Sequence, residues 1–166
     1  MDLSRAIDIV QTDTEISFSL VLDAPRELVF QTFSEAEHLR KWWGPKNCPV
    51  SSCTVDFRVG GEWRYSLRTS GGEEHWAKAI YDEITVNERI VFTDYFSTAE
   101  GDVIDGKPSK KVAVTFDDVN RETHVNIHVQ LASVAERQQL VDMGFMPGFQ
   151  SALANLRELL DKIEDK

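Results

Sequence analysis

The sequence contains little cysteine and no cluster of basic residues. Its 166 residues include two cysteines, Cys48 and Cys53, and 18 Lys and Arg against 28 Asp and Glu, a formal net charge of -10. A field of this sign repels nucleic acid and anionic membrane surfaces. We therefore expect no nucleic-acid partner. Because two cysteines fall short of the disulfide framework of a small secreted domain, we also expect both to be free thiols.

Long apolar runs are also absent from the sequence. No segment approaches the ~20 consecutive apolar residues that span a membrane. The opening segment, MDLSRAIDIVQTDTE, lacks the basic stretch and following apolar stretch of a secretory signal. Together with the free thiols, this predicts a cytoplasmic protein without stable membrane insertion.

Metal ligands are few and dispersed. The four histidines are His38, His75, His124 and His128, and none has a helical partner or a cysteine at ligand spacing. A structural zinc site needs a fuller set of such ligands. We therefore expect no metal site, and the sequence predicts no cofactor.

Local patterns along the chain nevertheless follow a clear order. The segment TEISFSLVLDAP alternates apolar and polar residues, which is the period of a half-buried strand. In APRELVFQTFSEAEHLRKWWG the apolar residues recur at helical spacing. Ser34, with Glu37 three residues later, predicts the start of a second short helix, which Gly44-Pro45 ends. Between residues 51 and 131 the period returns to two, in segments separated by polar turns.

The C-terminal segment is predicted to be one long amphipathic helix. Its apolar stripe consists of Met146, Phe149, Leu153, Leu156, Leu160 and Ile163. Proline is tolerated in the first turn of a helix but kinks its interior. We therefore expect a break or kink around Gly144 and Pro147, and a firm helix from about Pro147 to residue 163.

These patterns predict a single α+β domain over residues 1–166, with residues 1–11 as an N-terminal extension ahead of the first strand. Strands joined by tight turns form an antiparallel sheet, and its apolar face needs a cover that the final helix can supply. The expected architecture is a curved antiparallel sheet of six to seven strands wrapped around the long C-terminal helix. Two short helices follow the first strand.

Three segments carry a resemblance to a known family: APRELVFQTFSEAEHLRKWWGP, DFRVGGEWRY and MGFMPGFQSALANLREL. They resemble the START-like helix-grip (SRPBCC) superfamily, in the branch that includes the C-terminal domain of the heat-shock-protein ATPase activator and polyketide-cyclase-like proteins. The resemblance extends from about Ile16 to Leu160. It implies a helix-grip fold whose cavity, between sheet and long helix, suits an apolar or amphipathic small molecule. Pro147 departs from the family, which more often has a helix-compatible residue there.

The hairpin around Gly60-Gly61 determines which side chains face that cavity. A two-residue turn pairs Arg58 with Trp63 and places Asp56 beside an aromatic ring, so that a charged pair can grip a polar head group. A three-residue loop or bulge instead aligns two sets of residues into a plain apolar face: Val55, Phe57 and Val59 with Trp63, Tyr65 and Leu67. The sequence leaves both registers open, and a surface ion pair between Asp56 and Arg58 is the other interpretation.

Two adjacent tryptophans, Trp42 and Trp43, end the second short helix. Neighbouring residues on a helix point about 100° apart, so both indoles cannot face one ligand equally. We expect one indole to pack under the helix pair and the other to lie near the rim of the cavity.

The first functional hypothesis is a domain that binds a hydrophobic small molecule or lipid in its central cavity. The inward face of the final helix is both core and cavity wall, so its apolar residues serve packing and lining. The predicted ligand contacts are Trp43, Arg58, Trp63, Tyr65, Tyr95, Met146 and Phe149.

Two other functions stay open from the sequence. A cavity enzyme of the cyclase, dehydratase or hydrolase kind needs titratable groups that converge, and no catalytic residue can be assigned. The candidates for such a cluster are His75, Asp56, Arg58, Tyr65 and Tyr95. A chaperone or protein-interaction module instead predicts an exposed apolar patch. A homodimer is compatible with each of these functions.

Overall fold

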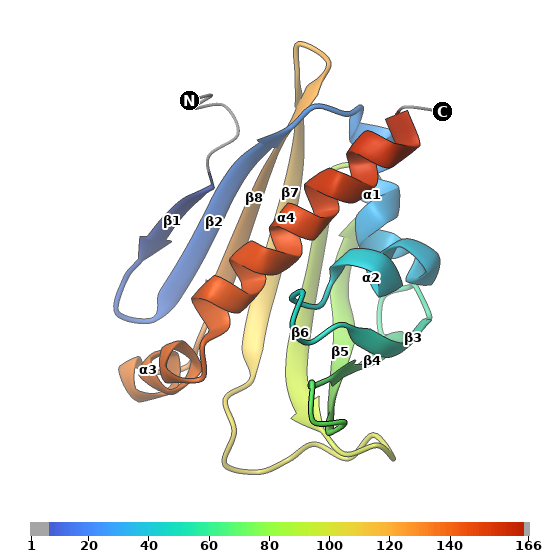
Figure 1. Ribbon diagram of the computed structural model, residues 1–166. Helices are drawn as coiled ribbons and strands as arrows, with labels where there is room; N and C mark the ends of the chain where they lie inside the picture. The colour runs from blue at the N-terminus through green and yellow to red at the C-terminus, as the bar shows by residue number, and fades with distance from the viewer. Residues whose placement is uncertain (1–6, 165–166) are drawn as a thin grey trace.

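The computed structural model describes residues 7–164, and over that range eight strands form one open antiparallel sheet (Figure 1). In chain order the elements are β1 (Asp8–Gln11), β2 (Glu15–Leu22), α1 (Arg26–Ser34), α2 (Ala36–Trp42), β3 (Val50–Val55), β4 (Glu62–Arg68), β5 (Glu74–Thr85), β6 (Arg89–Ser97), β7 (Lys110–Val119), β8 (Glu122–Gln130), α3 (Val134–Asp142) and α4 (Phe145–Glu164). Across the sheet the order is β1-β2-β8-β7-β6-β5-β4-β3. The N-terminal strand β2 therefore pairs with the last strand, β8, and the sheet edges are β1 and β3.

Alternation of apolar and polar residues gives the sheet one buried face. On β2 the side chains of Ile16, Phe18 and Leu20 are buried, and the serines between them point to the opposite face. The antiparallel register with β8 sets Ile127 opposite Phe18. Across β7 the same face continues with Val114, which pairs with Ile127.

The helix α4 covers this buried face and crosses it diagonally, with α2 beside it toward the β3 edge (Figure 1). Its buried residues repeat every three or four positions: Phe149, Ala152, Leu153, Leu156 and Leu160. Since both the sheet face and the helix stripe are apolar, packing them together removes both from water.

The predicted break before the long helix is confirmed, and it lies at Gly144. This residue has a φ of +85°, a left-handed conformation that glycine adopts without a steric penalty. The helix α4 then begins at Phe145, slightly earlier than expected. Pro147 falls in its first turn, where the N–H that proline lacks is not needed.

The expected α+β architecture is confirmed, but the sheet has eight strands rather than six to seven. The additional strand, β1, lies within the segment predicted to be an extension, of which residues 1–6 are outside the described range. It pairs with the sheet edge, Asp8 opposite Ser19, and its side chains are mostly exposed. A short edge strand of this kind has no clear alternation, so the sequence pattern did not reveal it.

Two helix starts also differ from the predictions. The helix α2 begins at Ala36, and Ser34 instead ends α1, where its hydroxyl donates to the Phe30 carbonyl at 2.9 Å. The helix α3 was not predicted at all. Ser133 caps it by accepting a hydrogen bond from the Glu136 N–H at 3.1 Å, the capping-box spacing that was misassigned to Ser34.

Within the described range, no helix is long and apolar enough to cross a membrane.

Candidate functional site

The two tryptophans have different environments, as predicted. Trp42 is fully buried beneath α1, and its Nε1–H donates to the Thr32 carbonyl at 2.7 Å. Its ring meets Phe33 edge-on, with centroids 4.8 Å apart. A buried indole with its N–H satisfied is a packing element. Trp42 therefore belongs to the structural core under the two short helices.

Trp43 is half-buried and lies between the sheet and α4. Its ring centroid is 4.6 Å from that of Trp63 and 6.1 Å from that of Tyr65, both on β4. On the helix side it is 5.5 Å from Phe149, which in turn stacks on Phe145 at 5.7 Å. Trp43 thus joins the aromatic residues of the sheet to those at the start of α4.

A row of polar side chains crosses the otherwise apolar sheet face next to these rings. The Tyr65 hydroxyl donates to Asp94 Oδ2 at 3.0 Å, and Lys110 Nζ lies 2.9 Å from the same oxygen. Asp94 and Lys110 are directly opposed on β6 and β7. On β5, between Tyr65 and Asp94, the inward residues are Ala77 and Ala79, whose small side chains leave room for the tyrosine to reach across.

The aromatic and polar residues close into one circuit of contacts. Lys110 Nζ lies 5.6 Å from the centroid of the Phe145 ring, a cation–π contact that links the polar row to the start of α4. We name this set the interior ring, and its members are Trp43, Tyr65, Asp94, Lys110, Phe145 and Phe149. It brings residues from β4, β6, β7 and α4 and from the end of α2 to one place.

The charges of the interior ring are shielded from water. The side chain of Asp94 is 2% exposed and that of Lys110 is 12% exposed. Burial raises the pKa of the Tyr65 phenol well above its ordinary value, and the neighbouring Asp94 carboxylate raises it further. Tyr65 therefore stays protonated at neutral pH and serves as a hydrogen-bond donor.

One carboxylate oxygen of Asp94 has no hydrogen-bond partner. Both partners of this carboxylate bind Oδ2, whereas Oδ1 is buried and has no hydrogen-bond partner. A buried carboxylate oxygen without a donor costs about 1–3 kcal/mol or more. The interior ring therefore holds an unsatisfied acceptor among aromatic side chains, which is an arrangement suited to a ligand that carries a donor group.

Most predicted ligand contacts lie in or beside the interior ring. Trp43, Tyr65 and Phe149 are members of it, and Trp63 meets Trp43 edge-on from the sheet. Met146 is half-buried and packs against the core in the first turn of α4. Five of the seven predicted contacts, four aromatic residues and one methionine, thus lie between the sheet and α4.

Two other predicted contacts lie elsewhere. Tyr95 follows Asp94 on β6 and therefore points to the outer face of the sheet, opposite Lys78. Arg58 lies on the surface beyond the end of β3, where its Nε pairs with Asp56 Oδ2 at 2.9 Å, and the two side chains are 69% and 54% exposed. Neither Tyr95 nor Arg58 contributes to the interior ring.

The hairpin register explains the position of Arg58. Val55 is opposite Trp63 and Cys53 is opposite Tyr65, so residues 56–61 form a connection longer than the two-residue turn. Gly61 packs so closely that an added Cβ would lie 2.1 Å from the Asp56 carbonyl oxygen. The register that would have turned Asp56 and Arg58 inward is therefore wrong, and their surface ion pair is confirmed.

The candidates for a catalytic cluster are not brought together. His75 is the second residue of β5, its side chain is 61% exposed, and its acidic partner is Glu73 at 4.0 Å. Asp56 and Arg58 are at the surface, and Tyr95 is on the outer face. Tyr65 alone of that predicted group lies in the interior ring.

Asp94 and Lys110 are not among the predicted site residues, although the strand pattern contains a signal for both. On β6 the inward positions alternate through Ile90 and Phe92, and the next inward position is Asp94. On β7 the inward residues Val112 and Val114 place Lys110 on the same face by the same period. An acidic and a basic residue, each at an inward strand position, identify a buried pair once the strands are paired.

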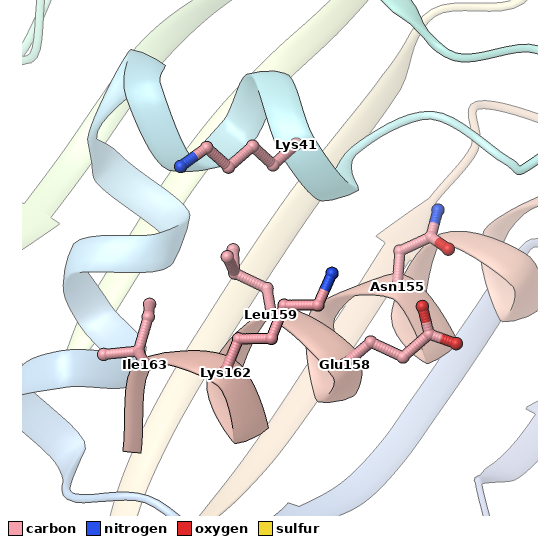
Figure 2. Close-up of a pocket in the computed structure, with 6 residues that line it drawn as sticks. All are labelled: Lys41, Asn155, Glu158, Leu159, Lys162 and Ile163. Carbon is pink, nitrogen blue, oxygen red and sulfur yellow. The ribbon is translucent and has the colours of Figure 1, made fainter. Parts of the chain in front are cut away.

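A surface groove lies away from the interior ring, between α2 and the last turns of α4. This groove has a volume of about 510 Å³ and is lined by Lys41, Asn155, Glu158, Leu159, Lys162 and Ile163 (Figure 2). At its margin Glu158 pairs with Lys46 at 2.9 Å, with both side chains more than half exposed. A smaller groove of about 310 Å³ lies along the connection that contains Asp56 and Arg58.

Cys48 and Cys53 are both free, and burial raises the pKa of each thiol, so neither is an activated nucleophile. Among residues 7–164, no three His, Cys, Asp or Glu side chains are grouped so that they could hold a metal ion. Large exposed apolar side chains in that range are distributed over separate segments: Val10, Val59, Val86, Val103, Val119, Val134 and Met143.

Solved structures with the same fold come from several bacteria. A protein from Arthrobacter aurescens, solved by NMR in solution, has a TM-score of 0.88 at 21% identity, over 93% of this chain and 91% of its own. A crystal structure from Mycobacterium smegmatis has a TM-score of 0.86 at 23% identity, over 93% and 97%. An NMR structure from Staphylococcus epidermidis has a TM-score of 0.79 at 25% identity, over 93% of each chain. No curated protein matches the sequence.

The family model for activator of Hsp90 ATPase homolog 1-like protein matches residues 23–161. That range runs from the end of β2 to the last turns of α4 and includes every member of the interior ring. It agrees with the resemblance to the START-like superfamily that the three sequence segments indicated. The chain therefore belongs to the family of activator of Hsp90 ATPase homolog 1-like proteins.

Proposed function

We propose that this protein binds a hydrophobic or amphipathic small molecule between the sheet and α4, at the interior ring. The observation that carries the proposal is the combination of Trp43, Phe145 and Phe149 with a buried carboxylate oxygen that has no partner. Ligand sites are typically lined by aromatic and apolar side chains, with a few polar groups that fix the orientation.

Entry to the site is proposed at the start of α4. Phe145 and Met146 are half-buried there, and they directly follow Gly144, whose left-handed backbone separates α4 from α3. The aromatic rings of the interior are already in contact with one another. A ligand therefore has to displace side chains. Because Phe145 and Met146 are only half-buried, they lose less packing than fully buried residues when they move.

The proposal is tested with N-phenyl-1-naphthylamine, a neutral probe whose fluorescence rises in apolar surroundings. The expected result is a saturable rise in probe fluorescence at one site per chain. In Trp43→Ala the Kd of the probe is expected to rise about tenfold, because the indole that contacts the probe is lost. The matched control is Trp76→Ala, which removes an indole from the outer face of the sheet, where Arg64 covers it at 5.9 Å. Equal weakening in both variants, or no saturable binding by the unmodified protein, would contradict the proposal.

Native mass spectrometry on protein purified from its own host is the complementary measurement. It is expected to show a non-covalent adduct on the unmodified protein and a smaller adduct fraction on Trp43→Ala. An adduct that is retained equally by Trp43→Ala places the ligand away from the interior ring.

A further inference from the structure

We propose that the interior ring selects ligands by an uncharged hydroxyl group, which donates a hydrogen bond to Asp94 Oδ1. This inference rests on the proposed function and adds the chemical class of the ligand's polar group. The oxygen is buried, and neither Tyr65 nor Lys110 reaches it, since both bind Oδ2. A donor on a ligand satisfies it without breaking either existing contact.

The charge balance of the site indicates that the donor is neutral. Lys110 already neutralises Asp94 at 2.9 Å, so the pair has no net charge before a ligand arrives. A second cation would add an unbalanced charge in a place with little water, and an anion would face the carboxylate oxygen directly. A hydroxyl group brings a donor and no charge.

The aromatic side chains lead to the same conclusion. Aromatic rings near a carboxylate are a common setting for a ligand cation. Here the ammonium of Lys110 already takes that place, with its Nζ 5.5 Å from the ring centroid of Phe96 and 5.6 Å from that of Phe145. The rings are therefore available to the apolar body of the ligand, while its hydroxyl is directed to Asp94.

The test compares probes of one size that differ in their polar group: 2-naphthol, 2-methylnaphthalene and 2-naphthoate. At neutral pH, calorimetry or probe fluorescence gives Kd for each with the full-length protein. Because hydrogen bonds to charged acceptors are the strong ones, 2-naphthol is expected to bind about tenfold more tightly than 2-methylnaphthalene. The anion 2-naphthoate is expected to bind most weakly.

Two double variants, with the same substitutions at the buried and at the exposed ion pair, show which pair causes the preference for 2-naphthol. Asp94→Val with Lys110→Met replaces the buried pair by apolar side chains, and Asp56→Val with Arg58→Met makes the same changes at the exposed pair. The preference for 2-naphthol is expected to fall about tenfold in the first and to persist in the second. Circular dichroism checks that both double variants fold. If the buried-pair variant does not fold, Asp94→Asn replaces it, because asparagine conserves the size of the side chain. In Asp94→Asn the preference is again expected to fall.

Each outcome decides between the two proposals. If 2-naphthol and 2-methylnaphthalene bind equally to the unmodified protein, or if the preference survives in the buried-pair variant, selection by Asp94 is wrong although the protein binds ligands. If neither probe binds, the proposed function fails and the inference fails with it. Tighter binding of 2-naphthoate than of 2-naphthol would also overturn the inference, because it would assign recognition to Lys110.

Discussion

Two ion pairs in this molecule have the same separation and opposite surroundings. Arg58 Nε lies 2.9 Å from Asp56 Oδ2, and Lys110 Nζ lies 2.9 Å from Asp94 Oδ2. The first pair is more than half exposed, whereas the second is almost completely buried. Since water and salt screen exposed charges strongly, only the buried pair is expected to matter for stability and recognition.

This comparison shows that the distance between the nitrogen and oxygen atoms of an ion pair does not reveal how much the pair contributes to stability or recognition. Asp56 and Arg58 are close in the chain, and their loop allows them to meet in solvent. Asp94 and Lys110 meet because β6 and β7 pair in a register that places them opposite one another. Separating the buried pair would leave a charge in an apolar interior, whereas separating the exposed pair would return two charges to water.

The largest effect is expected from Lys110→Met, which leaves the Asp94 carboxylate buried without a cation. Breaking a buried pair from one side costs about 3 kcal/mol in the free energy of unfolding. Urea denaturation measures the loss, and Arg58→Met is the matched control, with an expected change within about 0.5 kcal/mol. Similar losses in the two variants would remove the distinction between the pairs.

The next effect is a recovery of stability in the double variant Asp94→Val, Lys110→Met. Replacing both partners of a buried pair by apolar side chains is often neutral, so the double variant is expected to regain about 2 kcal/mol over Lys110→Met. A double-mutant cycle completed with Asp94→Val gives the coupling energy. Additive losses would mean that the two side chains do not stabilise one another.

A smaller effect is expected at alkaline pH from Tyr65. Its pKa is raised in the folded protein by burial and by Asp94, so above pH ~10 the unfolded chain releases a proton that the folded chain retains. Stability therefore falls as the pH rises, by about 1.4 kcal/mol per pH unit for this phenol. Burial also raises the pKa of Tyr81, which adds to the slope.

Tyr65→Phe should reduce that alkaline slope by the contribution of one proton, as measured by urea denaturation at several pH values above 10. Tyr81→Phe provides the comparison, because its hydroxyl is also buried but has no hydrogen-bond partner. A slope that Tyr65→Phe leaves unchanged would show that the phenol ionises equally in both states.

The smallest effect is expected from Arg58→Ala. The exposed pair is screened, so the free energy of unfolding should change by less than about 0.5 kcal/mol, and the Kd of N-phenyl-1-naphthylamine should not change. Thermal melting and the fluorescence titration measure both quantities. Weakened probe binding at unchanged stability would instead support Arg58 as a ligand contact.

Much of the fold could be predicted because it depends on periodicity. The alternation on β2 and β8 and the stripe on α4 each identify a buried face from neighbouring residues alone. Gly144 and Pro147 likewise marked the start of the long helix, since their backbone requirements are local. The short edge strand β1 and the capped helix α3 were missed, because neither has a strong apolar pattern.

The candidate site could be predicted only in part, because its geometry depends on strand register. Gly60 N–H donates to the Tyr81 carbonyl at 2.8 Å, and Tyr81 N–H donates to the Gly61 carbonyl at 3.1 Å. The connection after β3 is therefore held by β5, a partner that inspection of the hairpin segment alone cannot include. This contact keeps Arg58 at the surface.

By itself, the sequence determined an α+β domain in which aromatic residues of the strands and the final helix share one interior, since hydrophobic period is a local property. Only the tertiary structure decided which charges enter that interior. The register of β6 and β7 across the loop 98–109 opposes Asp94 to Lys110, and two alanines on β5 let Tyr65 reach Asp94. The physical reason is that an unpaired charge raises the free energy of the folded state only when packing removes it from water. A buried charge therefore requires a particular partner, whereas an exposed one does not.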